Sequence, residues 1–252
     1  HLGNIALHEC NLDGWDLSGM DLTGPNPNSY AVLEGPSLVG ADLSGSNLTN
    51  ARFAGDLSNA DLSNAILEDA RFEDTTWTGV NLSGAVIRGA RLADAPEHGL
   101  TPAALESTLS HQLRDLAGIR FTDCALAGWN FAECDLTAAV LAPCDLSGAN
   151  FSSAILLGVH ALHQTMTGAD FSGADLRGVT IKTNNFSSND FTGALINDAT
   201  IDGTFLAQHR LEPTASYQNQ DLSGITFDVT LTGWALDGFG LTGTTFADHD
   251  FN

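Results

Sequence analysis

The sequence predicts an all-β solenoid, a parallel β-helix in which each coil has four short sides. First, a bulky apolar residue returns at every fifth position, as Leu43, Leu48 and Phe53 do in "GADLSGSNLTNARF" (residues 40–53). Second, a small residue such as Ala41 usually stands two places before the bulky one, and Gly or Asn often follows two places after it. Third, no regular element buries this pattern, because a five-residue step turns an α-helix by roughly 140° and alternates the faces of a strand.

The five-residue period extends through most of the chain. It runs from Leu2 to Leu22, from Leu38 to Leu92 with a slip of one residue after Phe53, from Leu116 to Leu206, and from Leu222 to Phe251 with one slip. If five residues form one side and turn a corner, four sides return the chain to its start about 4.8 Å higher. Bulky and small residues then point inward, Gly and Asn tolerate the corners, and backbone groups pair with the coils above and below.

The segments "NADLSNAILEDARF" (59–72) and "GADFSGADLRG" (168–178) resemble the pentapeptide-repeat proteins. The resemblance covers nearly the whole chain and implies a right-handed quadrilateral β-helix. We therefore expect one solenoid over residues 1–252, with short helical or loop insertions near 23–37, 95–115 and 207–221. The family resemblance does not define a function, since the family is recognised by its core while the surface varies.

A longer block also repeats within the chain. Residues 107–131 resemble residues 213–236, and residues 1–17 fit the later part of the same block. Before the middle copy, Thr101 as N-cap and Pro102 at the first helical position predict a short helix. The block resembles a subset of the family found in secreted or surface-anchored bacterial proteins, which favours export. Because the chain begins at His1 rather than Met, we expect a precursor that extends upstream.

One tryptophan lies at the same place in each copy of the block: Trp15, Trp129 and Trp234. Each occupies the inward position that elsewhere holds a small residue. An aromatic ligand platform is one interpretation. We favour the other, in which each indole fills a wide or irregular coil beside an insertion.

The cysteines Cys10, Cys124, Cys134 and Cys144 also stand two places before a bulky residue, so we expect all four to point inward. A buried thiol behaves as a small hydrophobe, and we expect reduced packing residues. A Cys124–Cys144 disulfide is the alternative, because a spacing of twenty residues places the two on neighbouring coils. Zinc sites usually contain ligand pairs two to four residues apart, and these cysteines are spaced more widely.

Other motifs do not indicate chemistry. His160 and His163 are expected to point outward without strong ligands beside them, and His1 could chelate copper only with a second histidine, whereas His8 lies on another side. The segment "GFGLTG" (238–243) fits a dinucleotide-binding pattern, but no helical pattern follows it. We therefore predict no enzyme and no catalytic, cofactor-binding or metal-binding residues.

The charge is strongly unbalanced. The chain has 31 acidic and 9 basic residues and a formal net charge of −22. Such a surface repels nucleic acid and anionic membranes and suits a basic protein or a cation. No apolar run approaches the ~18 residues of a membrane-spanning helix, so we expect no membrane insertion.

The period predicts outward columns of residues twenty apart. These are Asn130, Asn150, Asp170 and Asp190; then Asp115, Asp135, Ile155, Asp175 and Leu195; and then Arg120, Val140, His160, Thr180 and Thr200. Stacked Asn side chains stabilise neighbouring strands, whereas stacked Asp side chains repel each other and could hold a cation.

The hypothesis we favour is a non-catalytic scaffold or protein-interaction module with an unknown partner, extracellular or on the cell surface, with a cytoplasmic location as the alternative. A second hypothesis follows from the family resemblance, since some acidic members imitate duplex DNA and bind DNA gyrase. Duplex DNA carries one charge per ~1.7 Å, whereas the acids here spread over several sides. A third hypothesis is a surface protein that binds calcium or copper through the Asp columns or His1.

Overall fold

A computed structural model describes residues 10–23, 30–35, 37–159, 165–182, 188–202, 208–228 and 233–246. The chain divides into two compact units, unit 1 (His1–Ala125) and unit 2 (Leu126–Asn252). In each unit the backbone of one coil pairs in parallel with that of the next. The fold is the predicted right-handed quadrilateral parallel β-helix.

Regular elements are short, because each side of a coil has only five residues. The strands are β1 (Val32–Glu34), β2 (Arg52–Asp56), β3 (Arg71–Thr76), β4 (Arg91–Ala93), β5 (Arg120–Thr122), β6 (Cys124–Ala125), β7 (Val140–Leu141), β8 (Cys144–Asp145), β9 (Thr180–Lys182), β10 (Thr200–Asp202), β11 (Thr226–Asp228) and β12 (Thr245–Phe246). The helices are α1 (Pro102–Glu106), α2 (Leu109–Gln112), the 3₁₀ helix η1 (Gln208–Arg210) and α3 (Ala215–Gln218).

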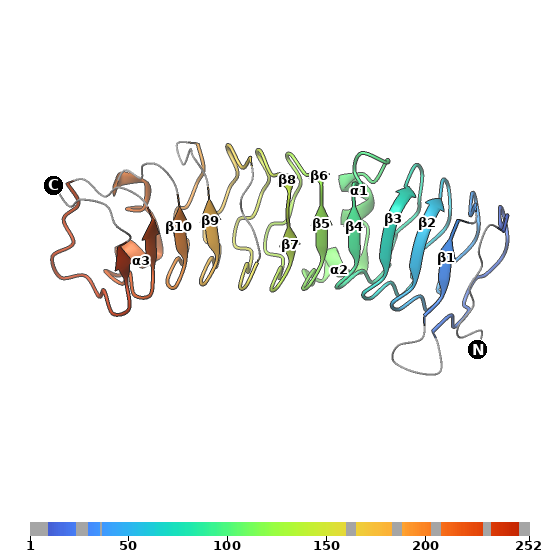
Figure 1. Ribbon diagram of the computed structural model, residues 1–252, viewed down its shortest axis with the longest axis horizontal. Helices are drawn as coiled ribbons and strands as arrows, with labels where there is room; N and C mark the ends of the chain where they lie inside the picture. Colours follow the sequence, from blue (N-terminus) through green and yellow to red (C-terminus); the bar gives the residue numbers. More distant parts are fainter. Residues whose placement is uncertain are drawn as a thin grey trace. The chain divides into compact units, whose positions relative to one another are not determined.

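In unit 1, strands β1 to β5 lie side by side in chain order (Figure 1). The slip after Phe53 appears as an irregularity between β2 and β3: Phe53 pairs with Phe72, but Gly55 pairs with Thr75. The shorter side is accommodated at Gly55, whose φ of 132° lies where glycine is favoured. One missing residue is therefore absorbed within a single coil, and the following sides keep their register.

In unit 2, strands β9 to β12 form a second parallel sheet, with Thr180 opposite Thr200 and Thr200 opposite Thr226. Other sides pair through single bridges, including Asp170 with Asp190. The predicted columns are confirmed for Asn130 to Asp190, for Asp135 to Leu195 and for Thr180 with Thr200, whereas His160 lies outside the described residues.

The core is the predicted double row of large and small side chains. Leu146 and Phe171 are completely buried, as are the small residues Ala149 and Ala169. Phenylalanines on successive coils of unit 2 stack face to face: the ring centroids of Phe131, Phe151, Phe171 and Phe191 are separated by 5.2, 5.1 and 5.3 Å. Each ring is thus covered by its equivalent on the next coil, which gives the solenoid its continuous apolar interior.

The helix predicted in the second insertion is confirmed. Thr101 caps α1 by accepting a hydrogen bond from the Ala104 backbone N–H, and Pro102 is its first residue. Packing on the core then buries Leu105.

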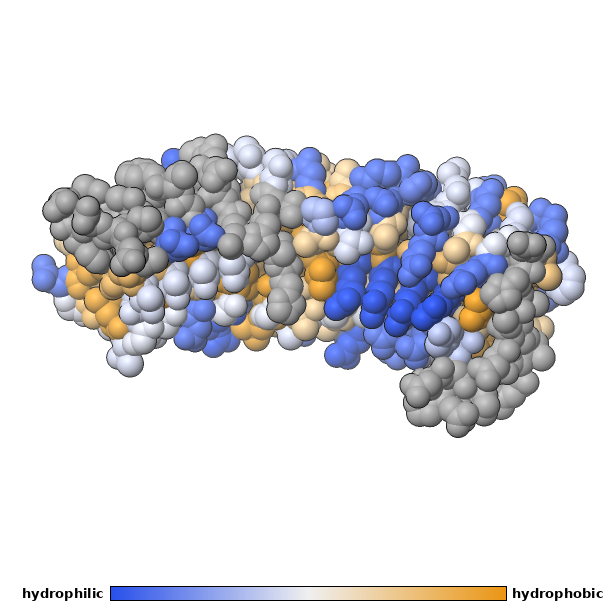
Figure 2. All heavy atoms as spheres, viewed as in Figure 1, coloured by the Kyte–Doolittle hydropathy of each residue, from blue (hydrophilic) through white to orange (hydrophobic). Residues whose placement is uncertain are grey.

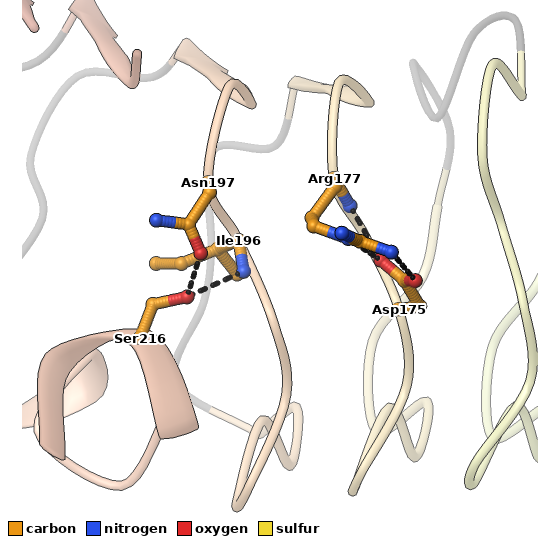
Figure 3. Close-up of polar contacts among 5 residues, drawn as sticks. All are labelled: Asp175, Arg177, Ile196, Asn197 and Ser216. Atoms are coloured by element: carbon orange, nitrogen blue, oxygen red, sulfur yellow. Dashed lines mark hydrogen bonds and ion pairs between the residues drawn. The ribbon is translucent and has the colours of Figure 1, made fainter. Parts of the chain in front are cut away.

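The copies of the longer block use the same contacts. In unit 1, Thr108 caps α2 and Ser110 Oγ accepts the Ile87 N–H at 3.0 Å. In unit 2, Thr214 caps α3 and Ser216 Oγ accepts the Ile196 N–H at 2.9 Å (Figure 3). Each helix therefore replaces one side of a coil, and its serine satisfies a backbone donor that a strand would have paired.

Two inward predictions were wrong. The side chain of Trp15 is 55% exposed, and Cys10 is exposed rather than inward. Both belong to the first described coil, in which Leu12, Leu17 and Leu22 are buried as expected; the five-residue period therefore places the bulky residues of this coil correctly but not these two. Cys124, Cys134 and Cys144 are buried, and the structure holds all four cysteines as thiols.

The other two tryptophans fill the interior to different degrees. Trp129 is buried and stacks on Phe131 with a centroid distance of 6.4 Å, as the filling interpretation requires. Trp234 is half-buried and meets the ring of Phe227 edge-on at 5.7 Å. Neither tryptophan forms an open platform.

Candidate interaction surfaces

The outward Asp and Asn side chains have a structural role at the corners. In each case the side-chain Oδ1 accepts the backbone N–H of the residue two places later: Asn150 from Ser152 at 2.9 Å, and Asp170 from Ser172 at 2.8 Å. Such Asx turns stabilise tight bends in the backbone. Because either residue type makes this bond, the corner requires the oxygen and not the charge.

The corner hydrogen bonds lower the pKa of some of the carboxyls that accept them. The pKa of Asp190 is lowered, chiefly by the hydroxyl of Thr192 and then by the Thr192 backbone N–H. The Ser18 hydroxyl and N–H lower the pKa of Asp16 in the same way. A carboxylate that accepts such bonds stays ionised. Part of the net charge of −22 is therefore carried by side chains that also hold the corners.

Replacing Asp190 separates the turn bond from the charge. We expect Asp190→Ala to lower the free energy of unfolding by about 0.5–1.5 kcal/mol, the net value of one hydrogen bond. Asp190→Asn retains the acceptor, as Asn150 does in its own turn, and should be nearly neutral at pH 7. Urea denaturation followed by circular dichroism measures both.

The same residue predicts a pH dependence. Because the folded-state pKa of Asp190 is lowered, its stabilising contribution is present above the ordinary pKa of about 3.9. It is lost as the pH falls through the folded value. The stability of the wild type relative to Asp190→Asn should therefore decrease below about pH 4. An unchanged difference between pH 7 and the acidic limit would contradict the assigned bond.

Unit 2 presents what we call the unit 2 acid ladder: Asn130, Asn150, Asp170 and Asp190, paired rung to rung. The neighbouring column differs, because Ile155 lies between Asp135 and Asp175. Arg177 neutralises Asp175 through two bonds of 2.8 and 2.7 Å (Figure 3), and this side-chain contact lowers the pKa of Asp175. The unit 2 acid ladder is thus the more continuous acidic feature of these two.

Unit 1 carries two ladders of opposite sign. The unit 1 acid ladder consists of Asp16, Asp42 and Asp61, with Asn81 as the fourth rung. The arginine ladder consists of Arg52, Arg71, Arg91 and Arg120, paired in register from β2 to β5. Figure 2 shows strongly hydrophilic residues gathered over these strands.

The arginine ladder was missed in the sequence. Its members are 19, 20 and 29 residues apart, so a search at a constant spacing of twenty residues does not align them. The slip after Phe53 and the insertion after β4 cause the shifts. A usable signal was present, because each arginine directly precedes a buried bulky residue, namely Phe53, Phe72, Leu92 and Phe121.

The four arginines have different surroundings. Arg52 lies over the ring of Tyr30 at 4.8 Å, and its Nη1 is 4.0 Å from Glu34 Oε1. Arg71 is half-buried, and Arg91 and Arg120 are exposed. Burial lowers the pKa of Arg91, and the charges of Arg71 and Arg120 lower it further.

No metal site is apparent in the described part of the chain, where no three His, Cys, Asp or Glu side chains converge. His1, His8, His160 and His163 lie outside that part. None of the helices in the described ranges has the length and apolar character that crossing a membrane requires. In the segment 238–243, Gly240 pairs with Asp221 as one rung of the solenoid.

The geometry defines a repeat protein whose outward ladders are held on a four-sided coil. A family model for the pentapeptide repeat region matches residues 115–191, and a model for pentapeptide repeats matches residues 29–55 and 56–94. Together the matches include more than half of the chain. The chain belongs to the pentapeptide-repeat family.

Solved structures of the same family resemble the chain at low identity. HetL, a pentapeptide repeat protein involved in heterocyst differentiation regulation from the cyanobacterium Nostoc sp. strain PCC 7120, is 21% identical, with 98% of this chain and 93% of HetL covered and a TM-score of 0.24. The plasmid-mediated fluoroquinolone resistance protein QnrB1 is 19% identical, with 97% of this chain and 90% of that chain covered and a TM-score of 0.32. No curated protein matched the sequence.

Proposed function

We propose that the chain is a non-catalytic β-solenoid that binds another protein through its outward ladders. The observation that carries the proposal is the unit 2 acid ladder, in which backbone pairing holds Asp170 directly over Asp190. The two carboxylates are fixed at the strand spacing of about 4.8 Å, and together with Asn130 and Asn150 they offer a preorganised polar and negative surface without the entropy cost of ordering a flexible segment. A partner segment rich in Lys or Arg complements this surface.

The acid ladder can be neutralised without disturbing the corners. Asp170→Asn with Asp190→Asn removes two charges and keeps both turn acceptors, since Asn150 makes the same bond. Asp135→Asn with Asp145→Asn removes the same charge from other sides of the coil, where each Oδ1 likewise accepts a corner N–H. The two variants therefore have equal net charge and differ only in the ladder affected.

The experiment is affinity purification from an extract of the source organism with the wild type and both variants. A protein that binds the unit 2 acid ladder should be captured at least about tenfold less by Asp170→Asn/Asp190→Asn, equivalent to the loss of about 1.4 kcal/mol. The control variant should capture it nearly as well as the wild type. Equal capture by all three proteins, or no enrichment over an unrelated solenoid, would refute the proposal.

DNA mimicry receives less support from the surface. The net charge of −22 favours it, but many outward acids serve the corners, and one side of unit 1 carries the arginine ladder. A gyrase supercoiling assay separates the two functions, because a mimic inhibits supercoiling at micromolar protein and the proposed module does not.

Export forms part of the same proposal. It is supported by the resemblance of the tryptophan-containing block to secreted and surface-anchored members of the family. Immunodetection in the medium and surface fractions tests it, and recovery only from the cytosol would refute it.

A further inference from the structure

The arginine ladder is unexpected for a chain with so few basic residues. The sequence has nine basic residues, and four of them form this one column in unit 1. Adjacent strands are about 4.8 Å apart, so the stacked guanidinium groups repel each other. Among the described residues, Arg71, Arg91 and Arg120 form no ion pair that would offset this repulsion. Asp69 and Glu73 act on the charge of Arg91, but they form no direct ion pair with it among the described residues. A row of outward cations at fixed spacing, three of them without a direct ion pair, is suited to an anionic partner.

The spacing of the ladder restricts the partner. Same-face side chains of an extended peptide repeat every ~6.8 Å, twice the rise per residue of a strand. Duplex DNA presents a phosphate every ~3.4 Å along each strand, and the net charge of −22 repels it. Another stack of parallel strands repeats at 4.7–4.9 Å. Only this last spacing keeps successive charges opposite the arginines over four rungs.

The chain itself carries an anionic ladder with the required spacing. The unit 1 acid ladder also has four rungs, with carboxylates at Asp16, Asp42 and Asp61. Within the described residues, only the Oδ1 atoms of these carboxylates accept hydrogen bonds, at the corners and from Asn81. Each Oδ2 remains available to a guanidinium group.

The two ladders cannot pair within one copy. Ten residues, or two sides of the four-sided coil, separate Asp42 from Arg52 and Asp61 from Arg71. The ladders therefore lie on opposite sides of unit 1. A contact between them must join different copies, and because it uses two different surfaces it is heterologous and can continue from copy to copy.

We propose that the chain self-associates side by side, with the arginine ladder of one copy bound to the unit 1 acid ladder of the next. Self-association is separate from the proposed binding of a basic partner, which uses unit 2 and a foreign protein. Loss of either interaction leaves the other measurable.

The proposal predicts an unusual dependence on salt. Each copy has a net charge of −22, and this repulsion reaches about 30 Å at 0.01 M salt but only about 10 Å at 0.1 M. At about 1 M salt the range falls to about 3 Å, which weakens the contacts themselves. Association should therefore be strongest near 0.1 M, whereas association through apolar patches strengthens as salt rises.

Sedimentation equilibrium of the purified full chain measures this association. Exposed ion pairs are individually weak, so we expect a dissociation constant on the order of 1 mM near 0.1 M salt. Arg71→Asp with Arg91→Asp reverses two rungs and should weaken association at least about tenfold. Other sides accept Asp at the same register position, as at Asp42 and Asp61, so the fold should tolerate the change. Circular dichroism and urea denaturation verify that the variant is folded.

A charge-reversed pair provides the decisive test. Asp42→Lys with Asp61→Lys also removes two corner acceptors, so its fold is verified by circular dichroism; it should weaken self-association to a similar extent, whereas an equimolar mixture with Arg71→Asp/Arg91→Asp should recover it. A wild type that remains monomeric at all three salt concentrations up to about 1 mM, or variants that associate as the wild type does, would overturn the proposal. The proposal would also be overturned if the arginine ladder bound poly-glutamate or duplex DNA while reversal of the ladder's charges left self-association unchanged.

Discussion

Replacing Phe151 with alanine should lower the free energy of unfolding by about 3–5 kcal/mol. The side chain of Phe151 is completely buried, and its ring lies between Phe131 at 5.2 Å and Phe171 at 5.1 Å. The substitution removes its apolar surface and leaves a cavity between two rings that are held by their own coils. Because the coils are spaced by backbone hydrogen bonds, they cannot collapse into the cavity, and the cost should reach the upper part of this range.

Urea denaturation followed by circular dichroism measures the effect. Phe151→Leu is the matched control, since leucine occupies the equivalent inward position at Leu146 and Leu156. It should cost less than about 1.5 kcal/mol, as volume-conserving core changes do. If Phe151→Ala lowered the free energy of unfolding by less than about 1 kcal/mol, the packing of Phe151 between Phe131 and Phe171 would not stabilise the fold as expected.

The second large effect concerns the small inward position. Ala169→Asp places a carboxylate at a site that is completely buried. An uncompensated buried charge costs about 3–5 kcal/mol, and the closely spaced coils leave no room for water to solvate it. We expect a similar loss in the free energy of unfolding, or a chain that fails to fold.

Thr167→Asp is the control, two residues away at an exposed corner. It adds the same charge to the same coil and should change stability by no more than about 0.5 kcal/mol. The two proteins are compared by urea denaturation and by the yield of soluble protein. Equal stability of the two variants would show that residue 169 does not face the interior.

Most of the scaffold could be predicted from the sequence, because the five-residue period acts through local geometry. Leu146 and Phe171 point inward, and Asp170 pairs with Asp190 on one side, as the period requires. Thr101 and Pro102 begin a helix because capping depends on neighbouring residues only. The prediction failed at Trp15 and Cys10, although Leu12 and Leu17 of the same coil are buried as expected. Periodicity gives the direction of a side chain but not what covers it.

The candidate surfaces were predicted less well, since they depend on register across interruptions. In the uninterrupted stretch of unit 2, a spacing of twenty residues gave the acid ladder correctly. In unit 1, the bulge at Gly55 and the helices α1 and α2 shift the spacing, and the backbone pairing of β2 to β5 shows that four arginines are stacked.

The sequence by itself therefore determined the family, the coil and most of the inward residues, because each five-residue side encodes its own turn and its own buried pair. Where the repeat is interrupted, as in unit 1, the tertiary structure decided which outward charges meet. Alignment between coils is set by hydrogen bonds between residues far apart in the chain, and insertions change the sequence spacing without changing the roughly 4.8 Å step between strands.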